Sequence, residues 1–440
     1  MHIRNRRIEK GRHKMKKNIQ LEEAQNILLD RVMPVGKCLV SLLEANGRIL
    51  SQDIKATISI PSFDKSALDG YALIASDTRQ AESSAPVQLR VIEETRAGFL
   101  SKEKVMPGTA IKVMTGAPIP DGANVIIKYE DVIRNGDSIS VFRTLKAQDN
   151  IVKAGEDVEE GEVVAFKGTL ITPPLVALLA GLGINHVPVY KKVKIAIMST
   201  GDELVCPSEE LQAGKIYNSS LYGLMARCHE LGGQPLDLGI VPDEIRSASA
   251  RIVKGLEEAD IVVSTGGVSV GDYDVIKDAM VEAGAEIIFW QVAMKPGSPV
   301  AAAVKNKKLI IGLSGNPAAA MVTFDLIIIP LLKKLMGINK PLLNKIQGVF
   351  ADNFTKASSQ RRFLRAKLER KDGIDYLKLT GDQGNGVLMS MVDCNILVDI
   401  PAGSGPVIYG QRVSGYIVGN VTDAYHEQPA LMLIGKSHPI

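Results

Sequence analysis

Residues 193–336 alternate between two kinds of segment, and this alternation restricts the possible folds more than any other feature of the chain. Short apolar, β-branched runs are typical of strands buried on both faces, and they occur at 193–199, 235–240, 261–264 and 286–292. A pair of short strands is also expected near 300–304 and 308–313. The amphipathic segments between and after these runs predict helices at 219–231, 243–258, 274–283 and 317–336. The alternation predicts an α/β domain with a doubly wound parallel sheet.

The stretch DIVVSTGGVSVGDYDVIKDAM, Asp260 to Met280, combines a strand, a glycine-rich loop and a helix. Its glycines permit tight turns, and the start of the helix offers free N–H groups to an anion. Asp272 and Asp274 lie in the same loop and would repel a phosphate unless a cation or a proton intervenes. A plain strand-to-helix turn with N-capping aspartates explains this stretch equally well.

Five unusual loops follow the predicted strands. In an open parallel sheet, ligands bind at the carboxyl ends of the strands, so these loops are expected to form one composite site. Carboxylates on three strand ends could hold Mg²⁺, and Lys295 with the glycine loops suits a phosphate. Each carboxylate taken alone could instead be a helix cap. The loops are Thr200–Glu203, Val241–Asp243, Thr265–Asp274, Met294–Gly297 and Ser314–Pro317, and the three carboxylates are Glu203, Asp243 and Asp274.

The rest of the chain predicts smaller elements around this domain. Asn18 can cap a first helix, and Ser41 with Glu44 fits a capping box on a second, short one. The loop IPSFDKSALDG at 60–70 is followed by strand-like segments between residues 87 and 142, which predict a small all-β insert. After Gly337, short alternating runs predict a β-barrel or sandwich.

Composition excludes several classes of protein. The net charge is +3, and much of the excess lies in residues 1–17, so nucleic-acid binding has little support. The four cysteines and six histidines show no metal-ligand spacing. The longest apolar run, Leu326–Leu332, is too short to span a bilayer. We therefore expect a cytoplasmic protein with free thiols.

Several motifs together resemble the molybdopterin molybdenumtransferase (MoeA) family, which is itself similar to the E domain of gephyrin. The resemblance runs from about residue 18 to the C-terminus with the motifs in order. They are FDKSALDGYA at 63–72, MTGAPIP at 114–120, AGEDV at 154–158, STGDEL at 199–204, STGGVSVGDYD at 264–274, MKPGSP at 294–299 and GLSGNPAAA at 312–320.

The resemblance implies a reaction and roles for residues. Adenylylated molybdopterin would bind with Mg²⁺, molybdate would enter at the dithiolene, and hydrolysis of the adenylate would release molybdenum cofactor and AMP. By motif match, the functionally important residues are Asp69, Thr115, Asp157, Glu203, Asp243 and Asp274, of which Glu203 and Asp274 would bind the metal. The phosphate side of the substrate would be held by Gly266, Gly267, Ser269 and Gly271. The pocket would be shaped by Lys295, Pro296, Gly297, Ser314, Gly315, Asn316 and Pro317, and Asp272 receives no role.

The family resemblance also implies the domain organisation and the partners. A molybdopterin-binding α/β domain (18–36 and 188–337) would follow a basic tail (1–17). A small α+β linker domain (37–58 and 162–187), a β-rich lid domain (59–161) and a C-terminal β-barrel domain (338–440) would complete the chain. A homodimer is expected, in which the lid of one subunit completes the site of the other. A molybdopterin adenylyltransferase and apo-molybdoenzymes are possible further partners, and neither nucleic acid nor a membrane is expected.

Three departures from the family pattern affect substrate contacts. Lys65 stands where an asparagine is usual, Ser314 replaces a proline, and Asn218-Ser219-Ser220 replaces Asp-Ser/Thr-Asn. Two other functions stay open at this point: a related nucleotide enzyme such as a molybdopterin adenylyltransferase or a pyrophosphatase, and a non-enzymatic scaffold or molybdate-storage protein. The lid motifs with Asp69 and Asp157 favour the molybdenumtransferase over a one-domain adenylyltransferase.

Overall fold

A computed structural model describes residues 16–268 and 275–419, and the chain divides into two compact units. One unit contains the residues up to Cys38 and those from Tyr190 onward, and the other contains Leu39–Val189. The first unit combines the predicted α/β domain and barrel, and the second contains the predicted linker and lid. No helix within the described ranges is long and apolar enough to cross a membrane.

The α/β part of the first unit is built on a seven-stranded sheet. Its strands run in the order β1 (Lys16–Ile19), β19 (Glu286–Val292), β21 (Val300–Lys305), β22 (Lys308–Leu313), β18 (Ile261–Thr265), β14 (Lys194–Thr200) and β17 (Gln234–Val241). Strands β14 and β18 are buried almost throughout, which explains their continuous apolar runs. The sheet is mixed rather than wholly parallel, because β21 forms a tight hairpin with β22 and runs antiparallel to both of its neighbours.

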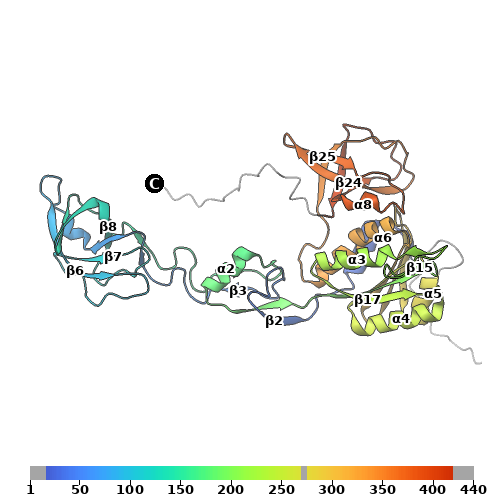
Figure 1. The fold of residues 1–440 in the computed structure, drawn as a ribbon, viewed down its shortest axis with the longest axis horizontal. Coiled ribbons are helices and arrows are strands. Elements are labelled where there is room, and N and C mark those ends of the chain that lie inside the picture. The colour runs from blue at the N-terminus through green and yellow to red at the C-terminus, as the bar shows by residue number, and fades with distance from the viewer. Residues whose placement is uncertain (1–15, 269–274, 420–440) are drawn as a thin grey trace, which may run out of the picture. The chain divides into compact units, whose positions relative to one another are not determined.

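Helices cover both faces of this sheet (Figure 1). Helices α4 (Ile245–Glu258) and α5 (Val275–Glu282) contact one another on one face, and α3 (Ser219–Glu230) and α6 (Pro317–Thr323) contact one another on the other. Helix α1 (Leu21–Leu29) packs against α7 (Ile329–Leu335). Leu238, Ile252, Val262 and Met280 are among the residues of a core between the sheet and the helices α4 and α5.

Three predictions for the N-terminal region are wrong. Helix α1 begins after Gln20, whose side chain makes no capping hydrogen bond, and Asn18 does not cap it because Asn18 belongs to β1. The expected tail of residues 1–17 also ends earlier, since Lys16 and Lys17 pair with Phe289 and Trp290 of β19. The second predicted cap is formed, with the Ser41 hydroxyl donating to Glu44, but the residues after it make turns instead of a helix.

The predicted helix 317–336 contains a wider turn. Between α6 and α7, Phe324–Ile328 forms a π-helical segment, in which Ile329 N–H donates to the Phe324 carbonyl. Pro330 has no N–H, so the Leu326 carbonyl four residues earlier lacks its usual helical donor. Gln25 on α1 supplies the missing hydrogen bond, with Nε2 2.7 Å from that carbonyl oxygen.

Replacing Gln25 by methionine is expected to lower the free energy of unfolding by about 1–3 kcal/mol, because the buried Leu326 carbonyl loses its donor. Urea denaturation followed by circular dichroism measures the effect. Asn26→Met, at the exposed neighbouring position of the same helix, is the control and should change little. Equal stability of the two variants would contradict the assigned role of Gln25.

The barrel of the first unit closes on itself. Its five strands pair in the order β24 (Arg361–Lys371), β25 (Ile374–Leu379), β23 (Lys345–Phe350), β27 (Arg412–Ile417) and β26 (Ile396–Ile400), and β26 returns to β24. A short strand, β20 (Met294–Lys295), pairs with β24 and ties the barrel to the loop after β19. The four-residue helix α8 (Met389–Val392) precedes β26. This confirms the predicted C-terminal barrel.

The second unit contains a six-stranded sheet and three small two-stranded sheets. The large sheet has the order β8 (Val125–Lys128), β5 (Gly70–Leu73), β7 (Thr109–Val113), β6 (Val87–Thr95), β10 (Ser138–Val141) and β9 (Val132–Asn135). The small sheets pair β4 (Lys65–Ser66) with β11 (Ile151–Val152), β3 (Ile54–Lys55) with β12 (Val163–Ala165), and β2 (Lys37–Ser41) with β13 (His186–Tyr190). Helix α2 (Pro173–Gly181) begins with two prolines, as expected at a helix start.

Candidate active site

Four of the five predicted loops meet at one edge of the seven-stranded sheet. Strands β17, β14, β18 and β22 are parallel neighbours, and their last residues pair across the sheet. Val241 lies beside Thr200, Ser199 beside Thr265, and Thr265 beside Leu313. The loops that start at Gly201, Pro242, Gly266 and Ser314 therefore leave the sheet together.

Glycines allow these loops to approach one another closely. A Cβ atom on Gly266 would lie 2.1 Å from the Thr200 carbonyl oxygen, and one on Gly315 would lie 3.2 Å from the Gly266 Cα. Thr265 Oγ1 also donates to the Ser314 carbonyl at 3.0 Å. Ser314 Oγ accepts a hydrogen bond from the N–H of Asn316 at 3.3 Å, so a side-chain hydrogen bond supports the turn at the position where the family pattern has proline.

Three carboxylates gather beside these loops. The N–H of Asp243 donates to Asp202 Oδ1 at 3.4 Å, and the Glu203 carboxylate folds over Gly201, where a Cβ would lie 2.5 Å from Glu203 Oε2. Partial burial raises the pKa of Asp243, and the negative charges of Asp202 and Glu203 raise the pKa further. Asp202 belongs to a predicted loop but was not among the predicted site residues. Its charge became significant only once the fold placed it beside Asp243.

This cluster of negative charge suits a divalent cation, since oxygen ligands of this kind bind Mg²⁺. Among the described residues, however, no three histidine, cysteine or acidic side chains are already arranged as a metal-binding group. Three predicted site residues of the loop after β18 lie outside the described ranges, Ser269, Gly271 and Asp274, and so does Asp272, to which no role was assigned. A metal site shared by Glu203 and Asp274 therefore stays a prediction.

A cavity of about 70 Å³ opens beside the carboxylates. Predicted residues Glu203, Gly315 and Pro317 line it, together with Asn218, Ser219 and Ser220. Asn218 and Ser220, which depart from the family pattern near the start of α3, are thus part of the cavity wall. Asn218 caps α3, because its Oδ1 accepts from the N–H of Leu221 at 3.3 Å and from Ser199 Oγ at 3.0 Å.

The fifth loop contains Lys295, Pro296 and Gly297. The Lys295–Pro296 peptide bond is cis, and the Lys295 side chain is exposed. Gly297 has a φ of +85° and packs against α6, where a Cβ would lie 2.0 Å from Thr323 Oγ1. Any larger side chain at position 297 would displace the loop from α6, the helix that begins at the Ser314–Pro317 turn.

In the second unit, Asp69 and Thr115 form a local pair. Gly70 and Val113 are partners on adjacent strands β5 and β7, which brings the residues just outside these strands together. Asp69 Oδ1 accepts hydrogen bonds from both the N–H and the Oγ1 of Thr115, each at 2.7 Å. These two bonds lower the pKa of Asp69. Asp157 lies in another loop, where its N–H donates to the Ile60 carbonyl at 3.0 Å.

The Thr115→Val substitution is expected to raise the pKa of Asp69 towards its ordinary value, because the hydroxyl donor is lost while the N–H donor stays. Carboxyl ¹³C NMR titration of the folded protein measures this pKa directly. Thr169→Val, elsewhere in the same unit, is the control. If the Asp69 pKa is the same in both variants, the hydroxyl does not stabilise the carboxylate.

The fold and the strand-end site define a multidomain α/β protein in which glycine-containing loops and acidic side chains meet at one edge of the sheet. Comparison with known proteins then identifies its family. Residues 19–183 match the MoeA N-terminal region (domains I and II), 196–334 a probable molybdopterin binding domain, and 347–418 the MoeA C-terminal region (domain IV). The chain belongs to the molybdopterin molybdenumtransferase (MoeA) family of enzymes.

Individual relatives agree with this assignment. The chain is 36% identical to a molybdopterin molybdenumtransferase of Bacillus subtilis over 86% of its own length and 89% of the relative's. It is 33% identical to one of Staphylococcus aureus over 93% and 97% of the two lengths. A crystal structure of a molybdopterin biosynthesis MoeA protein of Pyrococcus horikoshii is similar with a TM-score of 0.77 at 35% identity, covering 91% of this chain and all of that one.

Proposed function

We propose that this protein inserts molybdenum into molybdopterin as a molybdopterin molybdenumtransferase. Family membership along nearly the whole chain supports this function, and the strand-end site is the observation that carries it. Glycine loops and at least two acidic side chains occur together there, and we propose that Lys295 of the fifth loop joins them in the binding and cleavage of a phosphate-containing substrate. The substrates would be adenylylated molybdopterin and molybdate, and the products molybdenum cofactor and AMP.

The residues of the sheet edge would have separate roles in binding phosphate and binding the metal. The Gly266 N–H donates to the Leu313 carbonyl at 3.2 Å, so the backbone N–H groups from Gly267 onward, with the Lys295 ammonium, would bind phosphate oxygens. The carboxylates of Glu203 and Asp243, with that of Asp274, would hold Mg²⁺, whose charge stabilises negative charge developing during cleavage of a phosphoanhydride. The glycines cannot be enlarged without separating the loops, so they keep these groups in place.

The lid residues Asp69, Thr115 and Asp157 would serve the same reaction in a homodimer, with the lid of one subunit acting at the sheet edge of the other. The hydrogen bonds from Thr115 support a role for Asp69 in this reaction, because they keep its carboxylate charged and oriented. A molybdopterin adenylyltransferase would supply the substrate, and apo-molybdoenzymes would accept the product. The cytoplasm is the proposed location, which suits four free cysteines.

The decisive experiment combines the purified protein with adenylylated molybdopterin, molybdate and Mg²⁺. AMP release and activation of an apo-molybdoenzyme are both expected above a no-protein control. If neither appears, the proposed function is wrong. Formation of adenylylated molybdopterin from ATP and molybdopterin would instead indicate an adenylyltransferase.

A further inference from the structure

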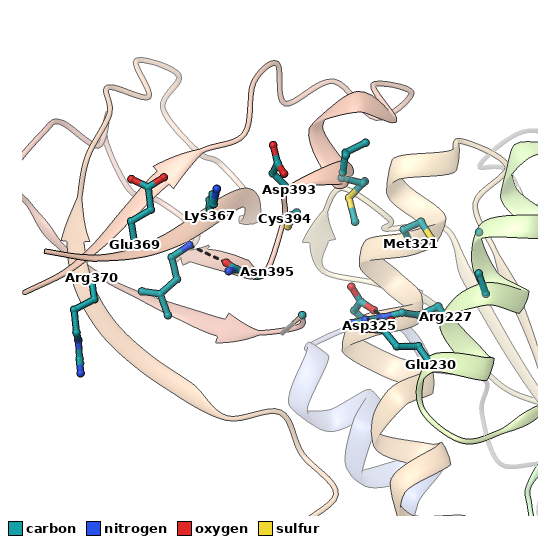
Figure 2. Close-up of a pocket in the computed structure, with 16 residues that line it drawn as sticks. Arg227, Glu230, Met321, Asp325, Lys367, Glu369, Arg370, Asp393, Cys394 and Asn395 are labelled. Atoms are coloured by element: carbon teal, nitrogen blue, oxygen red, sulfur yellow. Dashed lines mark hydrogen bonds and ion pairs between the residues drawn. The ribbon is translucent and has the colours of Figure 1, made fainter. Parts of the chain in front are cut away.

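A large cavity of about 870 Å³ lies between the α/β part and the barrel of the first unit (Figure 2). Its volume is in the range of clefts that bind ligands or chain segments, roughly 300–1,000 Å³. Helices α3 and α6 form one wall, and β24 with the chain around α8 forms the other. The cavity is separate from the strand-end site, since none of the predicted site residues lines it.

The barrel side of this cavity combines charged side chains, among them Lys367, Glu369 and Asp393, with the apolar side chains of Met391 and Val392. Helix α8 has only four residues, yet Met389 is 76% exposed and Val392 is 71% exposed. Val392 and Met391 line the cavity, and Met321 of α6 lines it from the opposite wall. Clustered exposed apolar side chains of this kind mark binding surfaces, and methionine suits them because its side chain is flexible.

The last described residue of the chain, Gly419, is also part of the cavity wall. Its N–H donates to the Asn395 carbonyl at 3.2 Å, which holds this point against the barrel. The sequence then continues through residues 420–440, which lie outside the described ranges and beyond the matched family domain. They include a continuous apolar run, Ala430–Ile434, between Pro429 and Gly435.

Tethering makes this segment a strong candidate to occupy the cavity. The run starts eleven residues after Gly419, a distance that an extended chain covers at roughly 3.3 Å per residue. A short flexible tether gives an effective concentration on the order of mM. A segment with an intrinsic Kd of about 0.1 mM would then be about 90% bound, without any partner in solution.

We propose that the C-terminal segment of this same chain, residues 420–440, binds in this cavity through the apolar run Ala430–Ile434. The bound segment covers Met391 and Val392 on the barrel and Met321 on α6. It thereby joins the barrel to α6, the helix that begins at the strand-end site. This binding does not depend on the proposed reaction and can be tested without substrate.

Methionine oxidation by hydrogen peroxide, followed by mass spectrometry, tests the proposal. In a chain that ends at Gly419, Met321 and Met391 are expected to oxidise about tenfold faster than in the full chain, given the occupancy estimated above. Met33 is as exposed as Met389 and lies away from the cavity, so it serves as the internal reference. Buried Met198 and Met280 report on whether the shortened chain is folded.

Two substitutions in the full chain give the same test without truncation. Leu433→Asp places a charge in the apolar run and is expected to reproduce the fast oxidation, whereas Ser437→Asp adds the same charge beyond the run and should leave Met321 and Met391 protected. Equal oxidation in the full chain and the Leu433→Asp variant would overturn the proposal. If the protection of Met321 and Met391 disappears when the protein is diluted, the proposal is also overturned. The cavity would then be occupied by a second copy of the chain.

Discussion

The Asp243→Asn substitution is expected to reduce AMP release by a factor of about 100, the upper end of the range for groups that support a metal site. The neutral amide cannot supply the negative charge that Asp243, Asp202 and Glu203 together offer to a cation. The substitution should not destabilise the folded protein. Because the pKa of Asp243 is raised in the folded state, its charged form opposes folding, and this cost grows as the pH rises above the ordinary aspartate value.

The matching measurement is thermal unfolding at pH 7.5 with and without Mg²⁺. Mg²⁺ is expected to raise the Tm of the unmodified protein and to raise that of Asp243→Asn much less, since a ligand stabilises only the state that binds it. Glu257→Gln, an exposed change on α4, is the control for loss of one negative charge. An equal Mg²⁺ effect in Asp243→Asn and Glu257→Gln would remove Asp243 from the metal site.

The Arg227→Met substitution is expected to lower the free energy of unfolding by about 3–5 kcal/mol at pH 7.5, the usual cost of leaving one partner of a buried ion pair alone. Asp325 lies in the π-helical segment with its side chain 3% exposed, and Arg227 Nε is 2.9 Å from its Oδ1 (Figure 2). Arg227 also binds Glu230. No other cation pairs with Asp325 among the described residues, so the loss of Arg227 leaves a buried charge.

The cost of this substitution should depend on pH. Burial raises the pKa of Asp325 to about 6, although Arg227 opposes the shift. The folded state therefore binds a proton more readily than the unfolded state, and this contribution to stability is lost as the pH rises from about 4 to 6. Without Arg227 the Asp325 pKa rises further, so the variant should lose less stability at pH 5 than at pH 7.5.

Urea denaturation at the two pH values measures this difference. Arg246→Met, an exposed change on α4, is the control, and the double variant Arg227→Met with Asp325→Leu should recover most of the lost stability. If Arg227→Met costs the same at both pH values, protonation of Asp325 does not relieve the unpaired charge.

Local patterns were enough for the elements that depend on neighbouring residues. The apolar runs predicted β14, β18 and β22 almost to the residue, because a strand buried on both faces needs a continuous apolar sequence. The sequence pattern did not show that β21 runs antiparallel within the sheet. It also did not show that Asn18 belongs to a strand that pairs with residues 289–292. Those pairings depend on contacts far away in the sequence.

The sequence by itself determined the family, the α/β alternation and the loops that form the candidate site. Glycine, proline and acidic residues at the ends of predicted strands can be recognised from the order of residues alone. Only the tertiary structure placed Asp202 beside Asp243, joined Asp69 to Thr115 across 46 residues, and set Gln25 against the carbonyl left free by Pro330. The physical reason is that charge repulsion and hydrogen bonding act over a few ångströms in space, and the distance between two residues along the chain does not reveal that separation.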